Sequence, residues 1–205
     1  MRRRRYSTFT PVLIIIILVV LYLLFRPHGT SLPGVGSSST AGTNATTTSG
    51  TAPKWGVQTK TSGCVVNGPL QDTACTPGAI LPDATKDKIC QSGYARSVRN
   101  VPTSEKNQVY AEYGIRSHAP GQYEVDHLVS LELGGSNDIA NLWPEAASPK
   151  PGFHEKDKVE NYLHDQVCSG AVSLEQAQIE IATNWLNVYH RMGSPSSNNQ
   201  GTPAP

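Results

Sequence analysis

Three patterns of apolar and polar positions divide the chain. An uncharged, mostly apolar run extends from Tyr6 to Phe25 and lies between Arg2–Arg5 and Arg26. Residues 26–53 are mainly Gly, Ser, Thr, Ala and Pro, a composition that cannot bury a core and is typical of a flexible linker. Apolar positions at strand and helix spacing follow, so we expect one folded domain over residues 54–192 and a disordered tail over 193–205.

The N-terminal run predicts a membrane anchor. About 20 apolar residues span a bilayer, and residues 6–25 have this length. The arginines of residues 1–5 should stay in the cytoplasm, which makes the protein single-pass with its domain on the extracytoplasmic side. A cleaved signal peptide is the alternative, but no small-x-small processing site follows the run.

Within the domain, the patterns predict an α+β fold. Residues 103–113 read as a helix, residues 123–128 and 141–143 as strands around Gly134-Gly135, and Pro144 as the end of the second strand. Apolar residues at a period near 3.6 predict helices over residues 154–168 and 173–189. We therefore expect a hairpin followed by a helix, with flanking helices packed around it.

Charge and cysteine content restrict the environment. The anchor contains five of the 17 basic residues and none of the 16 acidic ones, so the remainder carries a net charge of −4 and offers no general attraction to nucleic acid. The four cysteines allow three pairings, and an oxidising compartment favours disulfides. Among them we favour Cys64–Cys75 and Cys90–Cys168.

Asp126-His127 is the strongest candidate for chemistry. A carboxylate can hold a metal ion and a neighbouring imidazole can act as a general base, which together suit metal-assisted hydrolysis. Side chains alternate along a strand, so the two groups should point in opposite directions. An isolated Asp-His pair is more often a surface turn, so the context of this pair decides its interpretation.

That context resembles the HNH endonucleases, which have a ββα-metal site. The matching features are Asp126-His127, the Gly134-Gly135 turn, Asn141-Leu142-Trp143-Pro144 and His154 at the start of the next helix. The core of the match covers roughly residues 120–168. No Cys-x-x-Cys occurs, so the zinc-binding cysteines of many family members are missing and no structural zinc is implied.

The resemblance implies a role for each site residue. His127 would be the general base, Asn141 would bridge the backbone of the hairpin loop, and Asp126 and His154 would hold a divalent ion, with Glu145 and Asp157 as substitutes for His154. Mg²⁺ is the first choice for that ion, before Mn²⁺, Ni²⁺ or Zn²⁺. Some basic residues are candidate phosphate contacts, although such residues are more often solvated or salt-bridged: Arg96, Arg99, Lys156 and Lys158.

The implied function is a metal-dependent endonuclease that hydrolyses DNA with little sequence specificity, tethered outside the cytoplasmic membrane and without an obligate protein partner. Two alternatives stay open. One is a non-catalytic cell-surface binding module on an HNH scaffold, and the other is a hydrolase of a different phosphodiester.

Overall fold

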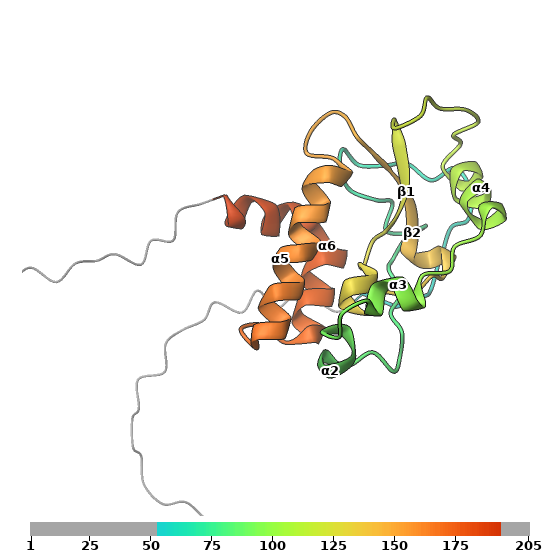
Figure 1. The fold of residues 1–205 in the computed structure, drawn as a ribbon. Helices are drawn as coiled ribbons and strands as arrows, with labels where there is room; N and C mark the ends of the chain where they lie inside the picture. The colour runs from blue at the N-terminus through green and yellow to red at the C-terminus, as the bar shows by residue number, and fades with distance from the viewer. Residues whose placement is uncertain (1–52, 194–205) are drawn as a thin grey trace, which may run out of the picture. The chain divides into compact units, whose positions relative to one another are not determined.

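A computed structural model of the chain describes residues 53–193, which contain helices and one two-stranded antiparallel sheet. The α+β class is therefore confirmed. The elements follow in the order α2 (Lys86–Ile89), α3 (Tyr94–Val98), α4 (Thr103–Glu112), β1 (Tyr123–His127), η1 (Leu131–Leu133), η2 (Ile139–Asn141), β2 (Leu142–Ala146), α5 (Phe153–Ser169) and α6 (Leu174–Met192). The hairpin lies between α4 on one side and α5 with α6 on the other (Figure 1).

The hairpin pairs Tyr123 with Ala146 at one end and His127 with Leu142 at the other. Pro144 lies inside β2, opposite Val125, whereas the sequence predicted that it would end the strand. The reason is that each strand of a two-stranded sheet has a free edge, where a missing N–H group costs no ladder hydrogen bond.

Two glycines shape the connection between the strands. Gly134 has a φ of 74° and closes the 3₁₀ turn η1. A Cβ atom on Gly135 would lie 1.8 Å from the carbonyl oxygen of Val129, so no side chain fits at that position. The Gly-Gly pair therefore brings the loop close to the end of β1.

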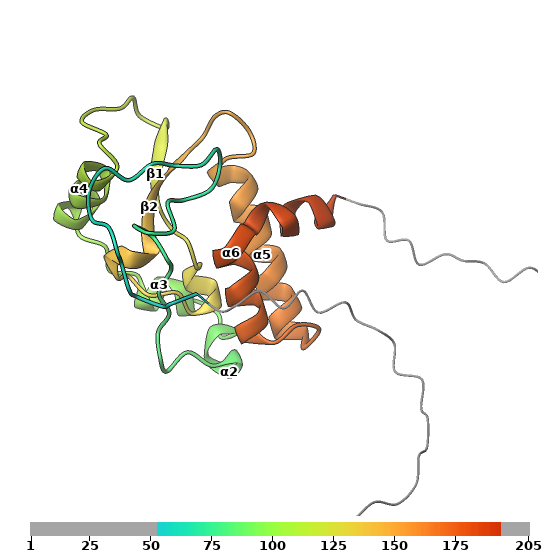
Figure 2. The same ribbon diagram turned by 180° about the vertical axis from the view of Figure 1, so that it is seen from behind.

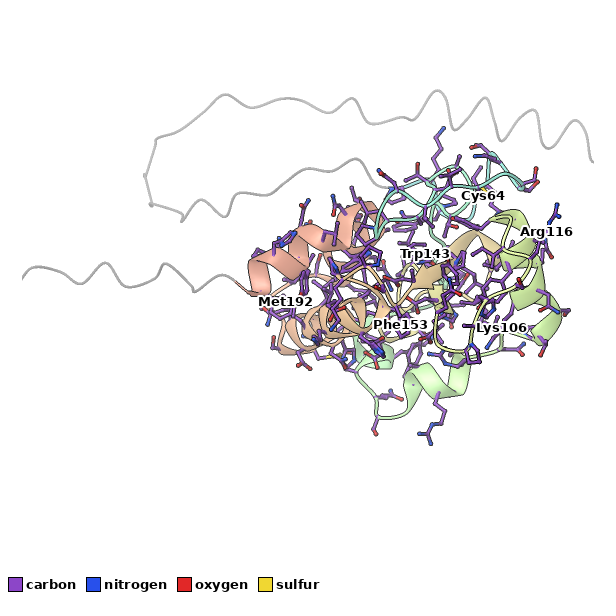
Figure 3. All side chains as sticks on the ribbon, turned by 90° about the horizontal axis from the view of Figure 1, so that it is seen from above. Cys64, Lys106, Arg116, Trp143, Phe153 and Met192 are labelled. Atoms are coloured by element: carbon purple, nitrogen blue, oxygen red, sulfur yellow. A yellow bond between two sulfur atoms is a disulfide. The ribbon has the colours of Figure 1, made fainter. Side chains whose placement is uncertain are left out.

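Helices α5 and α6 supply most of the core. The predicted helices over 154–168 and 173–189 are confirmed as α5 and α6, and α6 has a non-helical residue at Asn184, where its axis turns (Figure 2). The side chains of Leu163, Val167, Ile181 and Trp185 are almost fully buried. They pack in one cluster with Trp143 of β2, which lies in the middle of the domain in Figure 3.

Two disulfides crosslink the domain, one within the irregular segment before α2 and one between α2 and α5. Cys64 is bonded to Cys75 and Cys90 to Cys168, so both predicted pairs are confirmed. The second bridge joins the end of α2 to the last turn of α5.

The predicted anchor at residues 6–25 lies outside the described residues, as do the tails at 1–5 and 194–205 and nearly all of the linker. None of the helices within residues 53–193 combines the length and the apolar character that a membrane span requires.

Candidate functional site

His127 ends β1 in a buried position, with 2% of its surface exposed. Its Nε2 lies 3.2 Å from Oδ1 of Asn137. The orientation of that amide is fixed, because its Nδ2 donates to the carbonyl of Val98 at 2.7 Å and its Oδ1 accepts from the N–H of Asn100 at 3.1 Å. Since Oδ1 can only accept, Nε2 carries the proton of the imidazole and Nδ1 keeps the free lone pair.

The protonation state of His127 follows from its surroundings. Burial lowers the pKa of the imidazole to about 4, against the opposing effect of the negative charge on Asp126. The ring is therefore neutral at pH 7, and its Nδ1 can accept a proton. A neutral imidazole with a free lone pair is the form in which histidine acts as a general base, and the low pKa makes His127 a weaker base than an ordinary histidine.

Asn141 holds the loop that follows His127. Its Oδ1 accepts from the N–H groups of Val129 and Ala79, at 2.9 and 3.3 Å. Its Nδ2 donates to the carbonyls of Val129 and Ser136, at 3.0 and 2.8 Å. The fully buried amide thus ties both ends of the loop together, and it has no hydrogen-bonding group left for a substrate.

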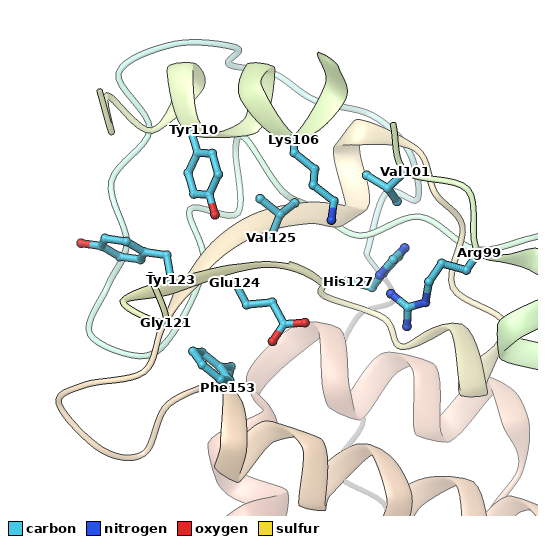
Figure 4. Close-up of a pocket in the computed structure, with 10 residues that line it drawn as sticks. All are labelled: Arg99, Val101, Lys106, Tyr110, Gly121, Tyr123, Glu124, Val125, His127 and Phe153. Atoms are coloured by element: carbon cyan, nitrogen blue, oxygen red, sulfur yellow. The ribbon is translucent and has the colours of Figure 1, made fainter. Parts of the chain in front are cut away.

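His127 opens into a cavity of about 380 Å³ between β1 and the segment leading into α4 (Figure 4). Arg99 and Val101 flank the imidazole, and Lys106 of α4 points towards it. Tyr110 and Tyr123 lie at the opposite end, with Glu124 between the two ends. The remaining lining residues are Gly121, Val125 and Phe153. The cavity therefore joins a basic end, which contains the imidazole, to an aromatic end.

Asp126 does not line this cavity, as expected from the alternation of side chains along β1. Its Oδ2 accepts a hydrogen bond of 2.7 Å from the ammonium group of Lys156, which is fully buried. The same ammonium donates to the carbonyl of His127 at 2.8 Å and to Glu160. A lysine of α5 therefore provides the cation next to Asp126.

The buried cluster around the ammonium of Lys156 contains the carboxyl groups of Asp126, Glu145 and Glu160, so carboxyl groups outnumber ammonium groups. Burial alone raises the pKa of Asp126, but the charge and hydrogen bond of Lys156, together with a hydrogen bond from Glu145, outweigh burial and hold the pKa below its usual range. Burial raises the pKa of Glu160 to about 7. Burial lowers the pKa of Lys156, but Asp126, Glu160 and Glu145 outweigh it, so the ammonium stays charged.

Glu145 completes the cluster from β2. Both of its carboxyl oxygens are buried and receive no hydrogen bond from a donor group within residues 53–193. Burial raises its pKa well above the usual value, and Asp126 lies within hydrogen-bonding reach. We therefore take Glu145 as protonated, with its O–H donated to the carboxylate of Asp126.

His154 lies apart from this cluster. Its side chain is 67% exposed, and its Nδ1 is 4.0 Å from a carboxylate oxygen of Asp157. Asp157, in contrast, interacts electrostatically with Asp126. Burial is the main cause that raises the pKa of Asp157, and the negative charge of Asp126 raises it further.

The basic residues predicted as phosphate contacts lie in different parts of the domain. Arg99 lines the cavity with His127, whereas Arg96 faces a different cavity, together with Cys90 and His164. Lys156 is buried, and Lys158 lies on the surface 3.7 Å from Glu155. The structure thus brings together His127 and Arg99 among the predicted site residues, and it adds Lys106, which the sequence did not single out.

The positions of these side chains test the metal site that the resemblance implies. The oxygens of Asp126 are engaged by Lys156 and Glu145, and His154 is exposed with Asp157 as its partner, so the two do not fit a shared ion. Within residues 53–193, one group of three potential ligands has its ligand atoms within 4.8 Å of one another, namely Cys90, His164 and Cys168. Its two sulfurs form a disulfide and are not thiolates, which are the form that binds metal.

Asn137 and Lys106 are the residues that sequence reasoning missed. Asn137 follows the Gly-Gly turn in the series Gly134-Gly135-Ser136-Asn137. Its place in a loop that folds back on the end of the first strand was the available indication that it contacts His127. Lys106 carried no such signal, because only the packing of α4 against the hairpin brings it to His127. Comparisons with family profiles, with curated proteins and with solved structures find no match to this chain.

Proposed function

We propose that this protein is an HNH-type endonuclease that hydrolyses phosphodiester bonds in DNA with little sequence specificity. The observation that carries the proposal is the state of His127. It is a buried, neutral imidazole, held in one tautomer by Asn137, at a cavity that also contains Arg99 and Lys106. The hairpin of β1 and β2 followed by α5 has the order of elements that the HNH resemblance implies.

In the proposed reaction, Nδ1 of His127 takes a proton from a water molecule as its oxygen attacks the phosphorus atom. The bond from phosphorus to the leaving oxygen breaks, and that oxygen is protonated by water. By the family resemblance, the products carry 5′-phosphate and 3′-hydroxyl ends. Arg99 and Lys106 offset the negative charge that builds up on the phosphoryl oxygens.

A divalent ion, Mg²⁺ before Mn²⁺, Ni²⁺ or Zn²⁺, belongs to the resemblance and would stabilise the same charge. Because Asp126 and His154 do not fit it as they are arranged, the proposal assigns no step to a metal bound by that pair. Lys156 neutralises Asp126 and fixes the carbonyl of His127, so it acts as a positioning residue for the base.

We place this reaction outside the cytoplasmic membrane, with residues 6–25 as the anchor and no obligate protein partner. The two disulfides support this location, because disulfides persist in oxidising compartments. Arg2–Arg5 support the orientation through the excess of positive charge expected on the cytoplasmic side.

A plasmid-nicking assay tests the proposal. The full-length chain in detergent should nick supercoiled DNA in buffer with Mg²⁺, and His127→Ala should lower the rate by about 10²–10⁴-fold, the usual contribution of a general base. His164→Ala is the matched control, because this histidine lies beside the Cys90–Cys168 bridge and should leave nicking nearly unchanged. Equal nicking by wild type and His127→Ala would refute the assignment of the base. A parallel reaction in EDTA shows separately whether a metal is required.

One observation favours a second candidate, a non-catalytic binding module on the same scaffold. Lys156 already satisfies Asp126, the residue that the resemblance assigns to the metal. A binding module predicts retention of labelled DNA by the wild-type chain and no strand breakage with or without Mg²⁺. The same nicking assay therefore distinguishes the two functions.

A further inference from the structure

A second cavity adjoins the one that contains His127. It has a volume of about 730 Å³ and lies between α4 and the segment that leads to β1. Tyr110 lines both cavities. Arg116 and His118 also line the second cavity, so each of the two cavities has at least one arginine in its lining.

The region where the two cavities meet is aromatic. The ring of His118 lies 4.5 Å from that of Tyr110 and 6.0 Å from that of Tyr123, measured between ring centroids. Both tyrosines are half-buried, so they are held in place and still exposed in part. Rings held in this way can stack against the flat face of an unpaired nucleobase.

The charges on this face are also available to a ligand. Arg99, Lys106 and Arg116 are exposed, and none of them forms a salt bridge with a carboxylate in the described part of the chain. The part of the protein beyond the anchor is acidic in total, so three exposed cations that line these two adjoining cavities make the local charge more positive than the average. Glu124 lies between the cationic end and the tyrosines, where it would repel a phosphate and could accept a hydrogen bond from the amino group of a base.

We propose that the two cavities form one track for single-stranded nucleic acid. The phosphate to be cleaved lies against Arg99 and Lys106 beside His127, the adjacent base stacks at Tyr110 and Tyr123, and the next phosphate lies at Arg116. The bases of a duplex stack on one another and cannot offer their faces to these rings, so the track selects unpaired strands. This inference rests on the proposed function for the phosphate at His127, and the binding of the strand is tested separately from its cleavage.

Fluorescence anisotropy with a labelled oligodeoxynucleotide, alone and annealed to its complement, tests the track. The full-length chain with His127→Ala serves as the parent, so that binding is measured without cleavage. We expect the single strand to bind more tightly than the duplex. Replacement of a ring by Leu, in Tyr110→Leu or Tyr123→Leu, should weaken binding of the single strand about tenfold, whereas Phe at the same positions should not.

Arg116→Gln should weaken binding and lower its salt dependence, because one phosphate contact is lost. Lys86→Gln is the matched control, since it removes an exposed cation of α2 that lines neither cavity and forms no salt bridge within residues 53–193. Equal binding of single strand and duplex, or Leu variants that bind like the parent, would overturn the track even if plasmid nicking is observed. Tight binding that depends on both tyrosines, without nicking by the wild type, would support the track and refute the nuclease.

Discussion

Asn137 determines which nitrogen of His127 can act as a base. Without its acceptor oxygen, the imidazole could adopt the other tautomer or rotate, and fewer molecules would present Nδ1 to water. We expect Asn137→Ala to lower the nicking rate by about 10–100-fold, the usual effect of losing a group that orients a site residue. Asn161→Ala is the control, because Asn161 is exposed on α5 and its side chain donates to the carbonyl of Asp157, one turn earlier on the same helix. Normal nicking by Asn137→Ala would mean that the tautomer is fixed in another way.

The buried state of His127 predicts the pH dependence of the reaction. Because burial lowers its pKa to about 4, kcat/KM should rise as the pH increases through about 4 and then stay level to pH 7. An ordinary histidine would give a rise near 6.5 instead. A pH–rate profile measured with single turnovers distinguishes the two, and an inflection at 6 to 7 would contradict the assignment.

The same pKa difference affects stability. Below about pH 6.5 the unfolded chain binds a proton at this position that the folded chain does not, so His127 lowers the free energy of unfolding as the pH falls from about 6.5 to about 4. Urea denaturation at a series of pH values would measure this loss, and His127→Gln should reduce its slope over that range.

At the scale of elements, Lys156 connects α5 to the hairpin. Its buried ammonium bonds to Asp126, to Glu160 and to the carbonyl of His127, so Lys156→Met removes the cation from two buried carboxyl groups and the donor from that carbonyl. Breaking a buried ion pair from one side typically costs about 3–5 kcal/mol. We expect a loss of this size in urea denaturation, and part of it should return in the double variant Lys156→Met with Asp126→Asn.

Lys158→Met is the matched control on the same helix. Its side chain is 63% exposed and its ammonium lies 3.7 Å from Glu155, so its loss should change the free energy of unfolding by less than about 0.5 kcal/mol. If both lysine variants are equally stable, the buried cluster does not hold α5 against β1.

The elements themselves were largely predictable, and the side chains of the site were not. Start and stop residues predicted α4, and apolar spacing predicted α5 and α6, because one face of each of these two helices packs into the core. The run Glu155-Lys156-Asp157-Lys158 reads as a solvated helix face, and sequence alone does not show which of its lysines is buried. Helix α5 begins with Phe153, whose ring is buried, and the turn of about 100° per residue then puts His154 on the outside. The placement of His154 as a metal ligand depended on that orientation, which the resemblance could not supply.

At the scale of the whole molecule, the two disulfides should differ in how much they stabilise the domain. The Cys90–Cys168 bridge spans 78 residues and the Cys64–Cys75 bridge spans 11. In the chain-entropy model, the longer loop gives about 4.5 kcal/mol and the shorter one about 3 kcal/mol, because a longer crosslink removes more freedom from the unfolded chain. Replacing both cysteines of a bridge by serine should therefore lower the melting temperature more for Cys90–Cys168 than for Cys64–Cys75.

The same bridges test the location of the domain. No cysteine lines the cavity that contains His127, so at temperatures well below unfolding both pairs of serine variants should retain the nicking rate of the wild type. Non-reducing peptide mapping of the full-length chain from cell envelopes should recover Cys64 linked to Cys75 and Cys90 linked to Cys168. Four free thiols in that preparation would contradict an oxidising environment, and with it the orientation inferred from Arg2–Arg5. Altered nicking by the Cys90–Cys168 variant alone would show that the bridge at the end of α5 also positions the helix whose Lys156 holds the carbonyl of His127.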